Sequence, residues 1–433
     1  MPNNPSGKYD IDEWDAVASV LSDGVPAISA DDLRTTTLNT IQVGRQNADN
    51  PDAAGTEADP WRNAIKNVLA SETLPVHIEL QDGWFTEPNA PFTVTDALVI
   101  TGPGRAARPL DKTPLCVVET TSGNGLLEID NSGGNHSAAQ GHIEGFWLHQ
   151  GAEDGTGTGI HLNEAHRWTI DNLGVSNFDT GIHIDGGLET HLGPGVYGLD
   201  NATHVRLTRS ATRGISPNVN KIEGVSRGGV GTHALRQQTG IRNDYRVTVE
   251  SNDQHGLTIE DGGVTAVSGY FEANNAGAKA DGHDILVNGH NYGLNINSVR
   301  TTGADVTASL SLDDLNTAII DSCFFADTNT VSVETTANTT TVYERSTRLN
   351  GSESIANWRD YHRDVFGNDL GTTGLYSANR KGVPEFDTEL VDVRDISNPA
   401  NGDVAFHDGS GSAARGLAIY FNGWEVFDSS TAP

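Results

Sequence analysis

The stretch GIHLNEAHRWTIDNLGVSNFDTGIHIDG, residues 159–186, decides the fold. Gly-Ile-His at 159–161 returns at 181–183, an offset of 22 residues, and each copy begins a run in which apolar and polar side chains alternate. Such alternation predicts a β-strand with one buried face. The isoleucine of each copy then points inward, so His161 and His183 point outward, one above the other on neighbouring strands.

Similar short β runs continue from about residue 115 to residue 345, separated by Gly, Asn, Asp or Ser. Strands that recur every 20–30 residues or so, with no helices between them, indicate a solenoid of β coils. A β-sandwich is the alternative, and the register of the repeat favours the solenoid. We therefore expect an all-β protein: a right-handed parallel β-helix with a short helical or irregular N-terminal arm and a small C-terminal β domain.

The start of the predicted solenoid has a specific order of elements. Asp59-Pro60 begins a short helix in WRNAIKNVLASE, and the runs VHIEL, PFTVT and ALVIT follow as strands. The turns between them include Asp82-Gly83-Trp84-Phe85 and Thr101-Gly102-Pro103-Gly104-Arg105. This order resembles the N-terminal part of pectate-lyase-like β-helix proteins, in which a short helix covers the open end of the coil stack. The resemblance implies a fold and not an activity.

The end of the chain has a second recognisable order of elements. A turn, a strand, a Gly-rich loop and a further strand are marked by Pro399, Asn401-Gly402-Asp403, Phe406, Asp408-Gly409, Tyr420-Phe421, Gly423 and Trp424. This order resembles the closing segment of tailspike and tail-fibre proteins of tailed viruses. The resemblance is short, and it implies a component of a virus particle.

We predict that the chain is divided into four segments. Residues 1–58 form an arm that docks to a particle and contain one amphipathic helix in IDEWDAVASVLSDG, with a disordered linker as the alternative. Residues 59–345 form the β-helix with its capping helix. Residues 346–383 form a neck or exit cap. Residues 384–433 form a β segment that serves as an oligomerisation or receptor-binding tip.

The composition is strongly acidic, with 58 Asp and Glu against 27 Lys and Arg and a net charge of -31. Such a charge repels itself in dilute solution and is screened in molar salt. The composition therefore indicates a halophilic protein, with an acidic protein of ordinary salt as the alternative. The same balance argues against a nucleic-acid partner. No apolar run is long enough to span a bilayer and no secretion signal is visible, so we expect no membrane insertion.

The candidate catalytic residues are Asp185, His183, His161 and Glu144. A carboxylate beside stacked imidazoles could act as an acid–base pair in polysaccharide cleavage. Glu164, Asp171 and Glu189 complete the cluster predicted on these coils. The motifs of known β-helix hydrolases and lyases are absent from the sequence, and a solvated acidic face is the alternative.

We predict no cofactor and assign no metal residue. His183, Asp185, Asp281, His283 and Asp284 carry groups that could ligate Ca²⁺ or Mg²⁺. No fixed loop spacing groups them, however, and the Gly-Gly-x-Gly-x-Asp calcium repeat does not occur. The cysteines, Cys116 and Cys323, lie in apolar runs and are predicted to be buried thiols.

Aromatic side chains near strand ends are candidates for glycan binding, because ring faces bury the C–H surface of sugars. The candidates are Trp147, Trp168, Tyr197, Tyr270, Tyr292 and Trp424. Packing in the core is the alternative for each of them.

These patterns predict a virion protein, either a tail spike or fibre or a capsid surface projection, that attaches to a halophilic host by binding a surface glycan or glycoprotein. We expect a homo-oligomer, with a trimer as the expected order, joined to other virion proteins through the arm. The alternative is a polysaccharide lyase or glycoside hydrolase acting on acidic surface glycans. A third option is an extracellular structural repeat protein.

Overall fold

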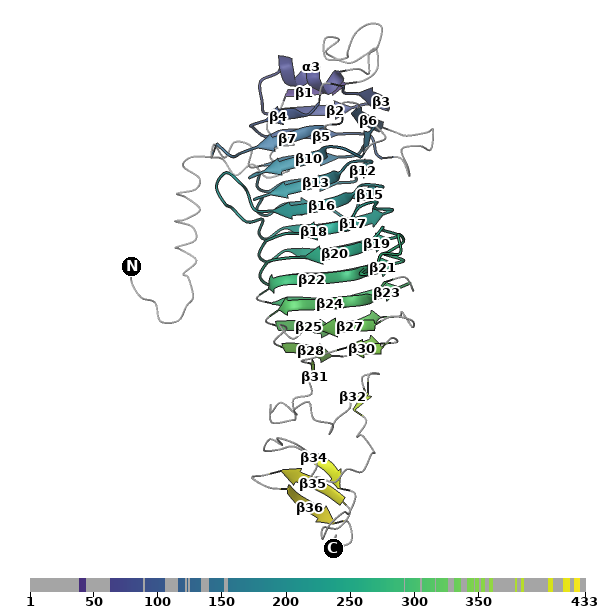
Figure 1. The fold of residues 1–433 in the computed structure, drawn as a ribbon. Coiled ribbons are helices and arrows are strands. Elements are labelled where there is room, and N and C mark those ends of the chain that lie inside the picture. The colour runs from purple at the N-terminus through teal and green to yellow at the C-terminus, as the bar shows by residue number, and fades with distance from the viewer. Residues whose placement is uncertain are drawn as a thin grey trace, which may run out of the picture.

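The computed structural model shows a solenoid of parallel strands with a short helix at one end (Figure 1). The structure describes residues 39–43, 63–88, 90–105, 116–120, 123, 125–133, 140–151, 155–291, 293–303, 306–315, 317–325, 331–335, 341–345, 347–349, 352–354, 358–360, 378–379, 383–384, 404–407, 416–420 and 424–428. Within these ranges no helix is long and apolar enough to cross a membrane.

One face of the solenoid is a sheet of eleven strands, which we call the eleven-stranded sheet. In stacking order its strands are β4 (Phe92–Val94), β7 (Leu127–Asp130), β10 (Thr158–Asn163), β13 (Thr180–Asp185), β16 (Thr203–Thr208), β18 (His233–Gln237), β20 (His255–Ile259), β22 (His283–Asn291), β24 (Ala308–Leu315), β27 (Val331–Thr335) and β30 (Ser352–Ser354). All neighbours pair in parallel.

The rest of each coil belongs to a sheet of twenty strands. These are β1 (Asn39–Val43), β2 (Val76–Leu80), β3 (Gly83–Thr86), β5 (Leu98–Thr101), β6 (Cys116–Thr120), β8 (Gly141–Glu144), β9 (Trp147–Gln150), β11 (Trp168–Asp171), β12 (Gly174–Ser176), β14 (His191–Leu192), β15 (Tyr197–Leu199), β17 (Lys221–Arg227), β19 (Asp244–Glu250), β21 (Thr265–Glu272), β23 (Leu294–Thr302), β25 (Thr317–Asp321), β26 (Phe324–Phe325), β28 (Thr341–Arg345), β29 (Arg348–Leu349) and β31 (Trp358–Asp360). Pairs such as β14 and β15 both stack on one longer strand, β17.

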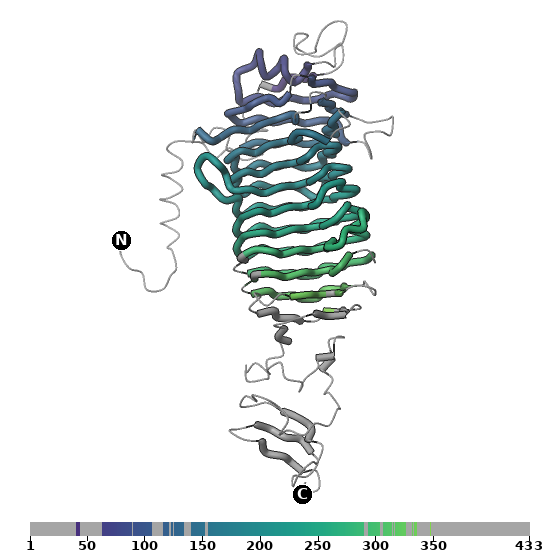
Figure 2. The backbone as a smooth tube through the Cα atoms, viewed as in Figure 1, coloured from purple at the N-terminus to yellow at the C-terminus, as the bar shows by residue number. Residues whose placement is uncertain are grey.

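The coils stack regularly along the chain (Figure 2). Ile160 and His161 on β10 lie directly opposite Ile182 and His183 on β13, as the 22-residue repeat predicts. Both isoleucines are fully buried, and they belong to one apolar cluster that runs through the solenoid. The prediction of a parallel β-helix is therefore confirmed.

Long strands of the twenty-stranded sheet bend where a glycine allows it. Gly224 in β17 and Gly269 in β21 have φ angles of 114° and 129°, outside the range that L side chains favour. A Cβ atom added to Gly269 would lie only 1.9 Å from the carbonyl oxygen of Val247 on the preceding coil. The bend and the close stacking of coils both depend on the missing side chain.

Buried asparagines satisfy backbone groups at the turns between sheets. Asn220 accepts a hydrogen bond from the N–H of Thr190 at 2.9 Å, and Asn243 accepts one from the N–H of Asn220 at 3.0 Å. Both amides are buried. Such a ladder meets the requirement that buried backbone polar groups find partners.

The helix at the end of the solenoid is α3 (Ala64–Ser71), which buries Ala64, Ile65 and Val68 against the first coils. The described helix begins at Ala64, after Asn63, and the start predicted at Asp59-Pro60 lies outside the described residues. The buried carboxylate of Glu87 accepts the N–H of Ile65 at 2.6 Å, so a distant side chain completes the helix start.

Two expected boundaries differ from the structure. Strand β1 pairs in parallel with β2, so residues 39–43 of the predicted arm belong to the coil stack. At the other end β29, β30 and β31 continue the parallel pairing beyond residue 345. Both segments are too short for alternation to reveal them in sequence. The helix predicted within the arm lies outside the described residues.

The C-terminal segment contains a separate antiparallel sheet of β34 (Val404–His407), β35 (Gly416–Tyr420) and β36 (Trp424–Asp428). Strands β32 (Ala378–Asn379) and β33 (Val383–Pro384) form an antiparallel pair before it. The strands expected around Phe406, Tyr420 and Trp424 are thus present. Cys116 and Cys323 are buried free thiols, as predicted.

Candidate functional site

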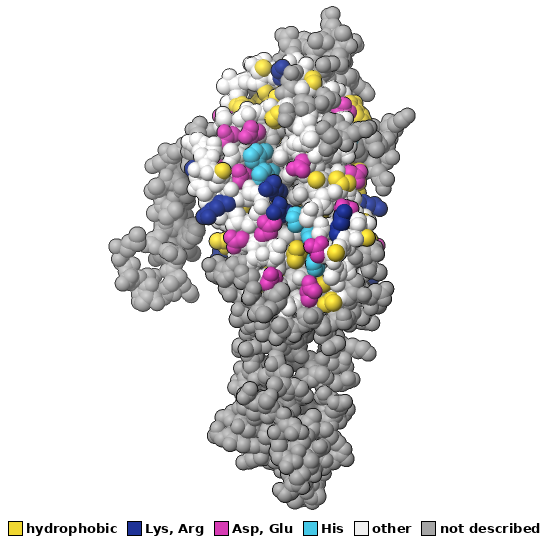
Figure 3. Space-filling view, viewed as in Figure 1, with side chains coloured by type: hydrophobic (Ala, Val, Ile, Leu, Met, Phe, Trp, Pro, Cys, Tyr) yellow, Lys and Arg dark blue, Asp and Glu magenta, His cyan; other side chains and the backbone are white. Residues whose placement is uncertain are grey.

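The outer surface of the eleven-stranded sheet carries a register-matched row of polar side chains. Its members are Glu128 on β7, His161 on β10, His183 on β13, Arg206 on β16 and Arg236 on β18. We call this row the histidine–arginine column. On this face, histidines lie above and below basic side chains, with acidic groups around them (Figure 3).

The two predicted histidines stack face to face. The ring centroids of His161 and His183 lie 4.7 Å apart, and the ring planes differ by 9°. The stack follows from the parallel register, because side chains at matching positions of neighbouring coils project in the same direction. The prediction that these two histidines lie one above the other on neighbouring strands is therefore confirmed.

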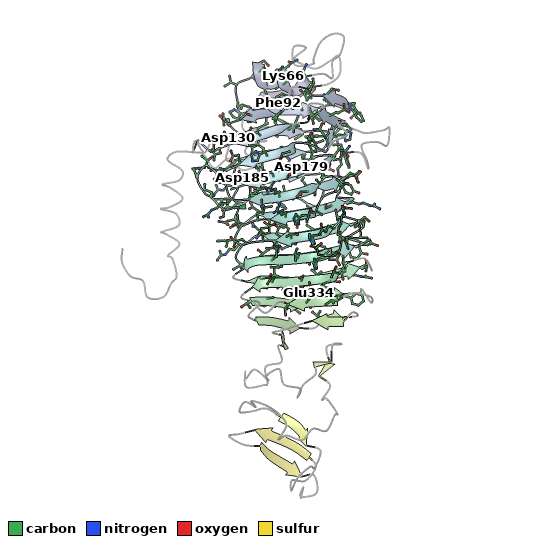
Figure 4. The ribbon with its side chains drawn as sticks, viewed as in Figure 1. Lys66, Phe92, Asp130, Asp179, Asp185 and Glu334 are labelled. Atoms are coloured by element: carbon green, nitrogen blue, oxygen red, sulfur yellow. The ribbon has the colours of Figure 1, made fainter. Side chains whose placement is uncertain are left out.

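A chain of hydrogen bonds connects His183 to Asp185. Thr208 donates its hydroxyl proton to Oδ1 of Asp185 at 2.7 Å. The Thr208 oxygen also lies 2.6 Å from Nε2 of His183, so Nε2 carries the proton and donates it. His161 Nε2 lies 3.9 Å from Oδ2 of Asp185, beyond hydrogen-bond distance. Asp185 and Asp130 lie near the same edge of the sheet (Figure 4).

The surroundings of this network set its protonation. Burial, the nearby His161 and the charge of Arg206 lower the pKa of His183 to about 3, although Asp185 opposes the shift. Burial would raise the pKa of Asp185, but hydrogen bonding and the neighbouring imidazoles outweigh burial and lower it. At neutral pH, His183 is therefore uncharged and Asp185 is ionised.

The other predicted catalytic carboxylates lie elsewhere. Glu144 is on β8 in the twenty-stranded sheet, opposite Asp171, and its carboxylate lies 3.1 Å from Nε2 of His142. Glu164 is fully buried and pairs with Arg213. The expectation that Glu144 joins His161, His183 and Asp185 is corrected, because each coil contributes to two sheets that face different directions.

Glu189 is also separate from the network. Its exposed carboxylate pairs with Arg167 at 2.8 Å. Of the predicted cluster, His161, His183 and Asp185 come together on the eleven-stranded sheet, and Glu144 and Asp171 lie opposite each other on the twenty-stranded sheet.

Two of the three tryptophans predicted as sugar platforms, Trp147 and Trp168, are fully buried. Trp168 belongs to the apolar core, and its ring covers Gly141 on the coil before it. The ring of Trp147 covers Gly174 on the next coil, and its Nε1 donates to Ser176 at 2.8 Å. Neither ring has a free face, so the expectation of glycan contact is corrected for both.

Two of the tyrosines predicted to bind glycan are only partly buried. Tyr197 is partly buried, with its ring 5.9 Å from that of Trp147 and the Arg105 guanidinium 5.2 Å from its centroid. Tyr270 is also partly buried, and its hydroxyl lies 2.8 Å from that of Thr302.

The remaining two aromatic candidates carry no side-chain description. Tyr292 lies outside the described residues, and Trp424 begins strand β36.

Sequence reasoning missed the cationic part of the column. Arg206 and Arg236 occupy the same strand position as His161 and His183, and an alignment of the coils by their inward residues would have revealed them. It would also have revealed a second stack, His233, His255 and His283, with centroids 5.4 and 5.3 Å apart. In the described ranges no group of three or more His, Cys, Asp or Glu side chains is arranged to hold a metal ion.

No family model and no curated protein matches the sequence. The structure is similar to a tailspike protein of an Acinetobacter phage, with a TM-score of 0.48 and 9% identity, covering 84% of this chain and 66% of that one. It is also similar to the A-module of the mannuronan C-5 epimerase AlgE4 of Azotobacter vinelandii, with a TM-score of 0.36 and 11% identity, covering 71% and 94% of the two chains.

Tailspike protein 3 of bacteriophage CBA120 is a further similar structure. Its TM-score is 0.33 at 10% identity, covering 98% of this chain and 77% of that one. The class defined by the topology is the parallel β-helix protein. At these identities no residue role carries over from the compared proteins to this chain.

Proposed function

We propose that this protein is a spike, fibre or projection on the surface of a virus particle and that it attaches to the host cell by binding a surface glycan. The observation that carries the proposal is the histidine–arginine column. It places imidazole and guanidinium groups in line along the outer face of a long sheet. Sugars are recognised through hydrogen bonds to such groups, and a polymer could run along the stacked coils.

The protonation of the column favours binding over hydrolysis. A glycosidase needs a carboxylic acid that keeps its proton near the working pH. The lowered pKa of Asp185 leaves it ionised, and the lowered pKa of His183 leaves it without a proton to give as a cation. Neither group is suited to protonate a leaving sugar.

The position on the virion is proposed from the ends of the chain. The C-terminal segment that resembles the end of tail-fibre proteins contains the antiparallel strands β34, β35 and β36. We infer that this segment supports a homotrimer and that the N-terminal residues before β1 dock to other virion proteins. The acidic composition supports a particle that works in high salt.

The test adds purified full-length protein, in molar salt, to halophilic host cells before infection. We expect the protein to bind the cells and to lower the number of infected cells. Periodate, which cleaves sugar diols, should abolish binding if it is applied to the cells first, whereas protease should not. Protein that neither binds the cells nor competes with the virus would exclude the attachment role.

A second candidate function is β-elimination of an acidic glycan. One observation favours it: uncharged His183 is held by Thr208 and Asp185, so its Nδ1 atom keeps a lone pair that can accept a proton. Incubation with uronate polymers should then release unsaturated ends, and Asp185→Asn should slow the release. No release from any uronate polymer would remove this candidate.

A further inference from the structure

Arg206 is a cation without a carboxylate partner in a strongly acidic protein. Its Nε and Nη2 atoms donate to Oε1 of Gln238 at 3.0 and 2.8 Å, and a glutamine carries no charge. Across the described residues, no carboxylate lies within ion-pair distance of this guanidinium. The chain has 58 acidic residues and 27 basic ones, so a cation left without such a partner calls for an explanation.

The neighbouring Arg236, unlike Arg206, has a carboxylate partner. Arg236 lies opposite Arg206 in the register of β16 and β18, and its charge is balanced by Glu260, which lies 2.6 Å from Nη2. Two like charges directly opposite each other destabilise a sheet. An external anion on Arg206 would remove that repulsion, as Glu260 does for Arg236.

The bond to Gln238 also fixes the direction in which Arg206 can bind. A guanidinium has five N–H donors, and one edge is formed by Nε and Nη2. Gln238 accepts from both atoms of that edge. The opposite edge, formed by Nη1 and the second hydrogen of Nη2, matches the two oxygens of a carboxylate. Arg206 is partly exposed, so a ligand can reach it.

Two imidazoles beside Arg206 are uncharged. His183 precedes it in the column, and burial, His161 and Arg206 lower the pKa of this imidazole. His233 is affected similarly: burial and the charges of Arg236 and Arg206 lower its pKa to about 4. The carboxylate of Asp185 is engaged by Thr208. The Arg206 guanidinium is therefore flanked by neutral imidazoles, and the ionised Asp185 forms no ion pair with it.

We propose that Arg206 anchors the carboxylate of an acidic sugar, so the glycan bound by the column is a uronate-type polymer. A single charge with one free edge suits a monoanionic carboxylate better than a dianion, which would need more cations. This inference rests on the proposed function, since it names the class of glycan that the same face binds.

The experiment measures binding of full-length protein to polygalacturonate, alginate and hyaluronate in molar salt by isothermal titration calorimetry. Methyl esters of the same polymers and a sulfated polymer with neutral sugars are measured beside them. We expect at least one uronate to bind, its ester to bind about tenfold or more weakly, and Arg206→Gln to lose affinity by a similar factor. Arg206→Lys should recover only part of it, because an ammonium lacks the planar fork.

Arg246→Gln is the matched control, because it makes the same charge change on the twenty-stranded sheet, where Arg246 is exposed and pairs with Asp244. It should leave uronate affinity unchanged. The melting temperature of Arg206→Gln should stay the same or rise, since the substitution removes a repulsion. A large fall would mean that Arg206 has a structural role.

The outcomes separate this inference from the proposed function. Equal binding of acid and ester, preference for the sulfated polymer, or unchanged affinity in Arg206→Gln would overturn the carboxylate site. So would failure of all three uronates to bind. If the protein still attached to periodate-sensitive sites on host cells in any of these cases, the attachment role would stand without the carboxylate anchor.

Discussion

The carboxylate of Glu87 accepts the backbone N–H of Ile65 at 2.6 Å, and both residues are fully buried. Helices usually receive this bond from a Ser, Thr, Asp or Asn side chain at their own N-terminus. Asn63 takes that position in α3 but makes no side-chain capping bond. Glu87 follows strand β3, so the bond ties the capping helix to the first coils.

Stability should depend on pH through Glu87. Burial raises its pKa to about 7 from an ordinary value of 4.5, although the N–H groups of Ile65 and Lys66 and the Lys66 charge oppose the shift. Between these values the folded protein binds more protons than the unfolded chain, so the free energy of unfolding falls as pH rises. The full effect is up to about 3 kcal/mol.

The substitution Glu87→Gln keeps an acceptor for Ile65 and removes this titration. Chemical unfolding at fixed salt should show that the variant gains stability relative to the native protein between pH 5 and pH 8. Glu189→Gln, at an exposed ion pair, should show no such gain. Parallel stability curves for native protein and Glu87→Gln would contradict the assignment.

The bend in β21 should not tolerate a side chain. Gly269→Ala would place a Cβ atom 1.9 Å from the carbonyl oxygen of Val247 at a φ of 129°. The coils would have to separate or the bend would have to change, and we expect a loss of more than about 2 kcal/mol in the free energy of unfolding. Gly133→Ala is the control, because no atom lies within 4 Å of its added Cβ. Equal stability of the two variants would refute the role of the bend.

The fold was predictable because the period of the solenoid appears in the sequence as a repeated pattern of apolar residues. Each coil needs inward apolar residues at matching positions, so Ile160 and Ile182 recur together with the histidines beside them. Short strands at the end of the solenoid show no such repeat in the sequence. In β1 the buried apolar residues are Ile41 and Val43, and two apolar residues in five cannot be distinguished from a polar arm.

The candidate site was less predictable because sequence spacing does not reveal which sheet a residue belongs to. Glu144 and His161 are on neighbouring coils but on different sheets. Burial of an outward ring is also decided by the next coil. Trp147 is covered because Gly174 leaves room for its ring, and that relationship is visible only once the register is known.

The titration of His183 should depend on His161. Burial is the largest cause of its low pKa, and His161 is the next. Below pH 6.5, His183 is protonated in the unfolded chain but stays neutral in the folded protein. The free energy of unfolding therefore falls as pH decreases toward 3. In His161→Gln the pKa of His183 should rise but remain below 6.5.

The measurement is a pH titration of ¹⁵N-labelled histidines in the native protein and in the variant. His149 is a useful internal reference, since it lies on the twenty-stranded sheet and burial is the cause of its lowered pKa. Its titration should be the same in both proteins. A native His183 that titrates near its ordinary value would show that the stack is not buried as described.

Removal of residues 384–433 should reduce the oligomer to a monomer. This segment contains Phe406, Tyr420, Phe421, Trp424 and Phe427, more aromatic surface than so short a segment can bury alone. Contacts between copies would bury it. Light scattering in molar salt should give three times the chain mass for the full-length protein and one chain mass for residues 1–383. A full-length monomer would refute the trimer.

The final prediction concerns salt. Glu250 and Glu272 lie directly opposite each other in the register of β19 and β21, and the chain carries a net charge of -31. Like charges in register destabilise a sheet, and the repulsion weakens as the Debye length falls from roughly 10 Å at 0.1 M salt to roughly 3 Å at 1 M. We expect the melting temperature to rise between 0.1 and 3 M NaCl. At 0.1 M, Glu272→Gln should melt higher than the native protein, and the difference should shrink as salt is added.

Divalent cations should restore stability after desalting better than sucrose does, because sucrose does not screen charge. A melting temperature that stays flat across this range, with no difference between the two proteins at low salt, would contradict the prediction that the chain is halophilic.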